Sequence, residues 1–146
     1  MERHLEPLAI VANITQAAHC WLDTVLITFG FLDARYRAMT GPEDAIGCVA
    51  ILASLEKRWL AADQNIFIAT VIVNPLFQTT PFTPGPRFTN ARIQSLLGLL
   101  YSRFFQSSPP ESFYTELREY LMGAGQYSEL VEVCSRHIRN SKRVVN

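Results

Sequence analysis

The chain has 146 residues, of which 49% are hydrophobic and 18% are charged. This composition excludes a wholly disordered chain, because enough apolar side chains are present to form a core. Thirteen Lys and Arg balance thirteen Asp and Glu, which excludes the basic overall surface of a free-standing nucleic-acid-binding protein and leaves room only for a local basic patch. Because little net charge keeps copies of the chain apart, we expect an apolar surface that binds a second copy or another protein.

The N-terminus and the cysteines indicate an intracellular protein without a membrane anchor. Acidic residues precede the first apolar run, unlike in a signal peptide, and no apolar stretch approaches the roughly twenty residues of a membrane-spanning helix. The three cysteines, Cys20, Cys48 and Cys134, are far apart in the sequence. We therefore expect buried free thiols, and neither a zinc site nor a disulfide framework.

The first predicted helical region extends from about Leu5 to Met39, as one long helix or as two joined helices. Its apolar residues recur at intervals of three and four and also lie off that stripe, as in a helix that packs on several sides. Gly30 is the expected weak point. Residues 40–44 contain a glycine and a proline and separate this region from a second helix, Pro42 to about Ala62. The expected buried residues of the second helix are Ile46, Val49, Leu52, Leu55 and Trp59.

Residues 65–73 fit either a strand or a helix. Their β-branched side chains favour a buried strand, but no second segment is available to pair with it. We therefore predict a short buried helix, ended by Asn74–Pro75. Residues 76–88 are rich in proline and are predicted to form a connector, with Phe77 and Phe82 docked on the helices.

The clearest predicted helix begins with Thr89 or Asn90 as its cap residue, and its apolar residues fall at i, i+3, i+4, i+7, i+8, i+11 and i+12. This uninterrupted core stripe is Ile93, Leu96, Leu97, Leu100, Tyr101, Phe104 and Phe105. Ser108 and Glu111 are predicted to form a capping box with proline at the first helical position of the next helix. That helix is expected to end at residues 123–125, which contain two glycines. Its expected buried face is Phe113, Tyr114, Leu117, Tyr120 and Leu121.

The last predicted helix extends from Ser128 to about Asn140. Together, the predicted helices indicate an all-α fold. We expect an irregular bundle of about six helices in a single domain over residues 1–146.

No catalytic site is predicted. The sequence lacks the nucleotide-binding, zinc-protease and serine-hydrolase motifs. The acidic pairs Glu116/Glu119 and Glu129/Glu132 have the i, i+3 spacing of a solvated helix face, which we favour over a cation site. We therefore expect no enzymatic activity, no cofactor and no metal ligand.

Four basic residues lie near the C-terminus: Arg136, Arg139, Lys142 and Arg143. They are candidate phosphate contacts, through which the chain would bind duplex DNA weakly. They equally suit the end of a helix, where cations complement the helix dipole, and we favour this second interpretation.

Four short motifs follow one another in the middle of the chain: Leu55-Glu56-Lys57-Arg58-Trp59, Ala62-Asp63-Gln64, Ile66-Phe67-Ile68-Ala69 and Asn74-Pro75. In this order and spacing they resemble a recurrent block of fungal hAT-family transposases. Residues 113–121 are similar to the segment that leads into the C-terminal dimerisation region of that family. The resemblance spans roughly Glu43 to Tyr127.

The resemblance implies the all-helical insertion domain of an RNase H-like transposase. The catalytic acids of the family lie upstream and downstream of that domain, no residue here can be matched to them, and the dimerisation motif is incomplete. The leading hypothesis is therefore a noncatalytic fragment of a hAT-type transposase, nuclear if the resemblance holds, with weak DNA association. The alternative is a helical protein-interaction module anchored by Trp21, Trp59, Phe104 and Phe105.

Overall fold

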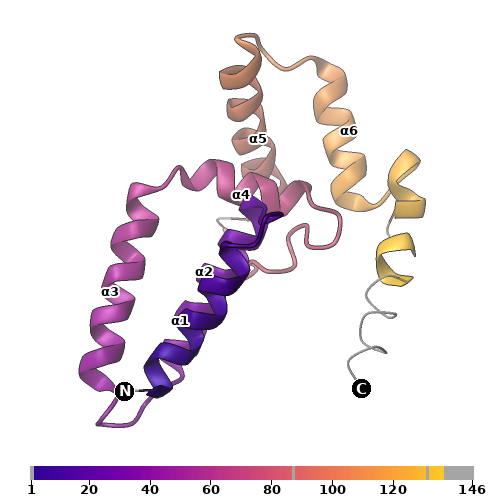
Figure 1. The fold of residues 1–146 in the computed structure, drawn as a ribbon. Coiled ribbons are helices and arrows are strands. Elements are labelled where there is room, and N and C mark those ends of the chain that lie inside the picture. The colour runs from indigo at the N-terminus through magenta and orange to yellow at the C-terminus, as the bar shows by residue number, and fades with distance from the viewer. Residues whose placement is uncertain (1, 87, 131, 137–146) are drawn as a thin grey trace. The chain divides into compact units, whose positions relative to one another are not determined.

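The structure, a computed structural model, describes residues 2–86, 88–130 and 132–136. Its helices are α1 (Glu2–Thr15), α2 (Leu22–Arg37), α3 (Ala45–Ala61), α4 (Gln64–Val73), α5 (Asn90–Phe105), α6 (Glu111–Met122) and a 3-10 turn, η1 (Gly125–Tyr127) (Figure 1). Residues 128–130 and 132–136 are also helical, and no strand occurs in the described ranges. The predicted all-α class with about six helices is confirmed.

The chain divides into two compact units, Met1–Val71 and Ile72–Asn146, each held together by its own internal contacts. The sequence predicted one domain with a connector at residues 76–88. The boundary between the units instead falls inside α4, ahead of that connector.

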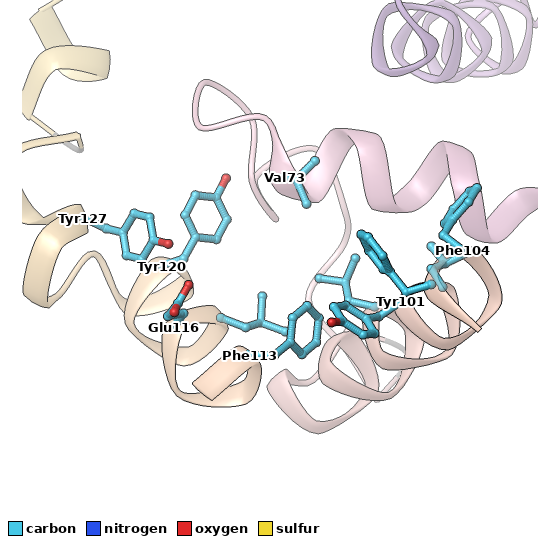
Figure 2. Close-up of a pocket in the computed structure, with 11 residues that line it drawn as sticks. Val73, Tyr101, Phe104, Phe113, Glu116, Tyr120 and Tyr127 are labelled. Atoms are coloured by element: carbon cyan, nitrogen blue, oxygen red, sulfur yellow. The ribbon is translucent and has the colours of Figure 1, made fainter. Parts of the chain in front are cut away.

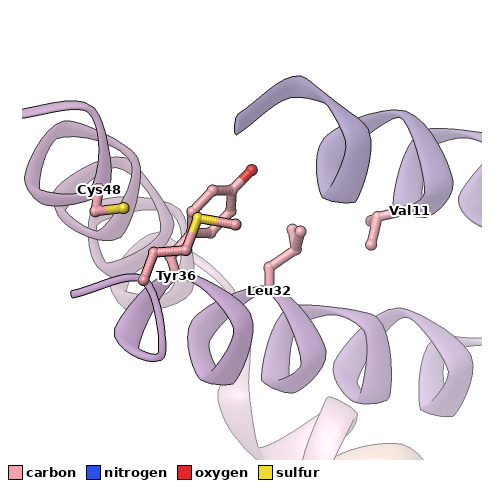
Figure 3. Close-up of a cluster of buried hydrophobic side chains, with 5 residues drawn as sticks. Val11, Leu32, Tyr36 and Cys48 are labelled. Carbon is pink, nitrogen blue, oxygen red and sulfur yellow. The ribbon is translucent and has the colours of Figure 1, made fainter. Parts of the chain in front are cut away.

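In the first unit, α2 runs antiparallel to α1, and α3 runs antiparallel to α2 (Figure 1). The end of α2 lies beside the start of α1, since the Tyr36 hydroxyl donates a 2.6 Å hydrogen bond to the His4 carbonyl. The buried side chains between these helices are Val11, Leu32, Tyr36, Met39 and Cys48 (Figure 3). Four partly buried residues pack around them: Leu8, Ile51, Leu52 and Leu55.

The N-terminal helical region is two helices that separate at residues 16–21. The chain does not break at Gly30, which lies inside α2, so the weakness predicted there stays a prediction. At the end of α1, the Thr15 hydroxyl donates to the carbonyls of Val11, at 2.8 Å, and Ala12, at 3.3 Å. A hydroxyl that bonds to these carbonyls loosens the helix locally, whereas a helical glycine costs only about 1 kcal/mol, which packing can exceed.

The predicted start and buried face of α3 need correction. The helix begins at Ala45, three residues after Pro42, because residues 42–44 form a turn. Ile46 is 87% exposed and Val49 is 67% exposed, whereas Cys48 on the opposite face is buried. Apolar residues occupy both faces of this helix, so periodicity alone does not reveal which face is covered.

Residues 65–73 belong to a helix, as predicted, and its Val71 and Ile72 are fully buried. In the connector that follows, the Phe82 ring stacks on Phe88 at a centroid distance of 4.3 Å. Phe82 thus packs within the connector, where we had expected it to dock on a helix.

In the second unit, α5 and α6 form an antiparallel hairpin joined by residues 106–110. Thr89 caps α5 as predicted, since its hydroxyl oxygen accepts from the Arg92 backbone N–H at 3.3 Å. The capping box at Ser108 is wrong: Pro110 occupies the cap position, without a side-chain cap bond. A residue that precedes proline disfavours the helical conformation, so Pro109 cannot begin the helix and α6 starts only after Pro110.

The predicted stop after α6 is confirmed. Gly123 has a φ of +61°, in the left-handed region that glycine adopts readily. The Gly123 N–H donates to the Tyr120 carbonyl at 3.2 Å, and the Ala124 N–H donates to the Glu119 carbonyl at 2.8 Å. This pair of hydrogen bonds is a Schellman motif, which satisfies the last carbonyls of the helix.

Candidate functional site

An open apolar groove of about 460 Å³ lies along α5 and α6 in the second unit (Figure 2). Its lining residues are Val73, Leu97, Leu100, Tyr101, Phe104, Phe105, Phe113, Glu116, Leu117, Tyr120 and Tyr127. Ten of these eleven side chains are aliphatic or aromatic. The groove therefore suits an apolar ligand and contains few polar groups that could orient a substrate or take part in catalysis.

The groove exists because the apolar stripe of α5 is only partly covered. Ile93, Leu97 and Leu100 are buried, but Phe104 is 65% exposed and Phe105 is 67% exposed. The prediction of an uninterrupted core stripe is therefore wrong for the last turn of α5. The chain leaves α5 at Gln106, whose φ of +52° ends the helix, and α6 does not cover the two phenylalanines that precede this turn.

Aromatic contacts support the wall that α5 and α6 share. The Tyr101 ring lies 4.5 Å from the Phe105 ring and 5.1 Å from the Phe113 ring, measured between centroids. Nearer the middle of the hairpin, Gly98 faces the Tyr114 hydroxyl. The glycine therefore allows α5 and α6 to approach closely on the side where the tyrosine lies.

Tyr120 forms a fixed part of the groove wall. Its hydroxyl donates a 2.9 Å hydrogen bond to the Ile72 carbonyl, and its ring packs edge-on against Tyr127 at 5.4 Å. Burial raises the pKa of Tyr120 to about 12, against an opposing hydrogen bond with Gln78. The hydroxyl is therefore a neutral donor at physiological pH, already engaged with the backbone.

A polar cluster with a buried carboxylate lies in the first unit. It was not predicted from the sequence. Asp44 is only 2% exposed. Its carboxylate lies 3.1 Å from His4 Nε2 and 3.3 Å from the Arg3 guanidinium. The three residues tie the start of α1 to the turn before α3. No local pattern in the sequence signals a contact between positions forty residues apart, and we assign the cluster a structural role.

Of the four candidate phosphate contacts, the structure describes only Arg136. Arg136 lies 3.7 Å from Glu132, one turn earlier, and both side chains are exposed. The other three candidate phosphate contacts, Arg139, Lys142 and Arg143, lie outside the described residues. Their contact with DNA stays a prediction.

The four aromatic residues predicted as interaction anchors separate into two groups. Phe104 and Phe105 line the groove together. Trp21 and Trp59 belong to the first unit, where Trp21 is 71% exposed and Trp59 packs edge-on against Phe67 at 6.2 Å. The groove therefore contains two of the four anchors.

Other features of the described residues add no chemical group to the groove. Cys48 and Cys134 are buried free thiols, as predicted, whereas the free thiol Cys20 is half-buried. No cluster of three or more His, Cys, Asp or Glu residues suited to a metal ion occurs in the described ranges. None of the helices described is both long and apolar enough to cross a bilayer.

Comparisons of the chain with protein-family models, curated proteins and solved structures gave no match. The resemblance to hAT-family transposases therefore rests on the sequence motifs alone. In the structure, these motifs lie at the end of α3, along α4 and just beyond it.

Proposed function

We propose that this chain is a helical protein-interaction module whose α5–α6 groove binds an apolar helix of another protein. The observation that carries the proposal is the exposure of Phe104 and Phe105, 65% and 67%, beside a concave apolar surface. Large apolar residues gathered on an exposed, hollowed surface are typical of interaction sites.

A helix is the ligand that suits this groove best. Two antiparallel helices leave a groove between them into which a third helix can pack, as in a helix bundle. Small-molecule sites commonly enclose about 70–90% of the ligand surface. Phe104 and Phe105 of this groove remain largely exposed, which favours an occupant that covers them from outside, with apolar anchors at i, i+3 or i+4, and i+7.

An origin as a noncatalytic transposase fragment with weak DNA association is proposed only on the sequence motifs. Arg136 has an acidic neighbour, Glu132, at 3.7 Å, and this carboxylate would compete with a DNA phosphate. The exposed apolar groove therefore supports protein binding more strongly than the described part of the basic cluster supports DNA binding.

The proposal can be tested with a fluorescently labelled, leucine-rich amphipathic helical peptide in a binding titration followed by anisotropy. We expect the wild-type chain to bind the peptide, and Phe104→Ala/Phe105→Ala to weaken binding at least about tenfold, because buried aromatic anchors commonly dominate the free energy of binding. Circular dichroism checks that the variant is folded.

Leu99→Ala is the matched control for this experiment. Leu99 lies on the same helix and is 67% exposed, as Phe105 is, but it does not line the groove. It should bind the peptide as the wild type does. Failure of the wild type to bind, or equal weakening by both variants, would refute the groove as the binding site.

A further inference from the structure

We infer that the groove selects a partner helix that carries a lysine or arginine beside its apolar face, and that Glu116 makes this selection. The inference rests on the proposed function and names the chemistry of the partner. Its basis is the position of one carboxylate in a surface that is otherwise aliphatic and aromatic.

Glu116 is the single charged residue among the eleven that line the groove. It lies on α6 with Phe113 one turn before it and Tyr120 about one turn after it, and Figure 2 shows its side chain between theirs. No ion pair joins Glu116 to another residue in the described part of the chain. The carboxylate is thus set within the apolar wall and is hydrated while the groove is empty.

A helix seated in the groove would remove water from this carboxylate. Taking a carboxylate out of water without a charged partner is unfavourable. The Tyr120 hydroxyl cannot replace the lost water, because it already donates to the Ile72 carbonyl. A partner that places an ammonium or guanidinium group at this point replaces the lost hydration with a charge-assisted hydrogen bond. A partner with a neutral or acidic residue there does not.

The same carboxylate argues against a second copy of the chain as the occupant. A two-fold pairing through the groove would use the same surface on both copies, so two Glu116 carboxylates would enter one apolar interface. Like charges placed together in an interface oppose association. We therefore assign the groove to a basic amphipathic helix of a different protein.

Three labelled peptides with identical leucine positions test the inference. They carry lysine, glutamine or glutamate beside the apolar face, and their dissociation constants are measured by anisotropy at low salt. For the wild-type chain we expect the lysine peptide to bind at least about tenfold more tightly than the glutamate peptide. Glu116→Gln should remove most of this preference, and Glu116→Lys should reverse it.

Glu129→Lys is the matched control, since Glu129 is an exposed acid of the same unit that does not line the groove. It makes the same change in net charge and should leave the order of the three peptides unchanged. If the control reverses the order as Glu116→Lys does, the selection comes from overall charge and the inference is wrong.

The outcomes separate the inference from the function on which it rests. Equal affinity of the wild type for all three peptides, with binding still lost in Phe104→Ala/Phe105→Ala, would overturn the charge selection and keep the groove. Binding unaffected by the phenylalanine substitutions would overturn both. Dimerisation seen by light scattering and abolished by the same substitutions would show that a second copy occupies the groove, and would overturn the inference.

Discussion

Tyr120 connects the groove to the backbone of the second unit through one hydroxyl. The hydroxyl donates to the Ile72 carbonyl at 2.9 Å, and burial raises its pKa to about 12 from an ordinary value of 10.0. Proton loss from this group in the folded chain leaves a charged phenolate among aromatic neighbours and removes the donor from the Ile72 carbonyl. The folded state therefore favours the neutral form.

This pKa predicts a loss of stability in alkali. A group whose pKa is raised on folding contributes stability that is fully present below its unfolded value, here 10.0, and is lost as the pH rises through its folded value, here about 12. We expect the free energy of unfolding to fall across this window, and to fall less in Tyr120→Phe. Tyr36, whose pKa burial also raises, should leave part of the fall in place in that variant.

Urea denaturation of the wild type and of Tyr120→Phe at a series of alkaline pH values checks the prediction. The alkaline loss of stability in Tyr127→Phe should lie between those two, because the charge of Tyr127 also raises the pKa of Tyr120. A Tyr120→Phe variant whose alkaline loss equals that of the wild type would contradict the prediction.

The Tyr114 hydroxyl of α6 limits the size of the residue that α5 can carry at position 98. A Cβ added at Gly98 would lie 2.8 Å from the Tyr114 hydroxyl oxygen, but 3.5 Å and 3.6 Å from the nearest ring carbons. The first distance is too short for two unbonded atoms, whereas the others are ordinary contacts. The ring therefore leaves room for an alanine at position 98 once the hydroxyl is gone.

Gly98→Ala alone and Gly98→Ala/Tyr114→Phe should thus differ in stability. The single change gains helix propensity but forces the hydroxyl to move, whereas the double variant keeps the gain without the clash. We expect the double variant to be more stable than Tyr114→Phe by up to about 1 kcal/mol. Urea denaturation of the four chains in a double-mutant cycle measures the coupling, and additive effects of the two changes would show that the hydroxyl does not obstruct the site.

Local sequence signals identified the elements that depend on near neighbours. Thr89 caps α5 through a residue three positions away, and Gly123 ends α6 through its own backbone conformation. Residues 65–73 were assigned to a helix because no strand partner existed, and the structure agrees. In each of these cases the deciding interaction, or its absence, can be read from the sequence.

The faces of the helices depend on where distant segments pack, and here the sequence was ambiguous. The outer face of α3 carries Ile46 and Val49, which fit a core pattern as well as Leu52 and Leu55 do. Phe104 and Phe105 continue the core stripe of α5 by spacing, yet the path of α6 leaves them exposed. The spacing of these residues therefore predicts a buried core and does not indicate a groove.

The surroundings of two charged residues were likewise not predictable from the sequence. Glu116 belongs to an acidic pair with the spacing of a solvated helix face, and only the position of α6 shows that it lines an apolar groove. Asp44 fits an acid at the start of a helix, although it is buried beside His4 and Arg3, which belong to the start of α1. Burial of a charge depends on tertiary packing, which local spacing does not encode.

At the scale of the whole molecule, the division into two units implies two cores. Leu32 is 3% exposed within the core of the first unit, and Ile93 is 2% exposed in the second. The boundary between the units lies inside the continuous helix α4, which joins them covalently. Whether a defect in one core affects the other unit depends on how strongly the two cores are coupled.

We predict that each core stabilises only its own unit. Leu32→Ala and Ile93→Ala should therefore destabilise different sets of helices. Each substitution removes a buried aliphatic side chain and should cost about 2–5 kcal/mol in its own unit. Hydrogen exchange followed by mass spectrometry reports the opening free energy of each helix. We expect Leu32→Ala to speed exchange in α1, α2 and α3 and to leave α5 and α6 as in the wild type, and Ile93→Ala to do the reverse. Faster exchange in both units after either change would instead identify one cooperative fold.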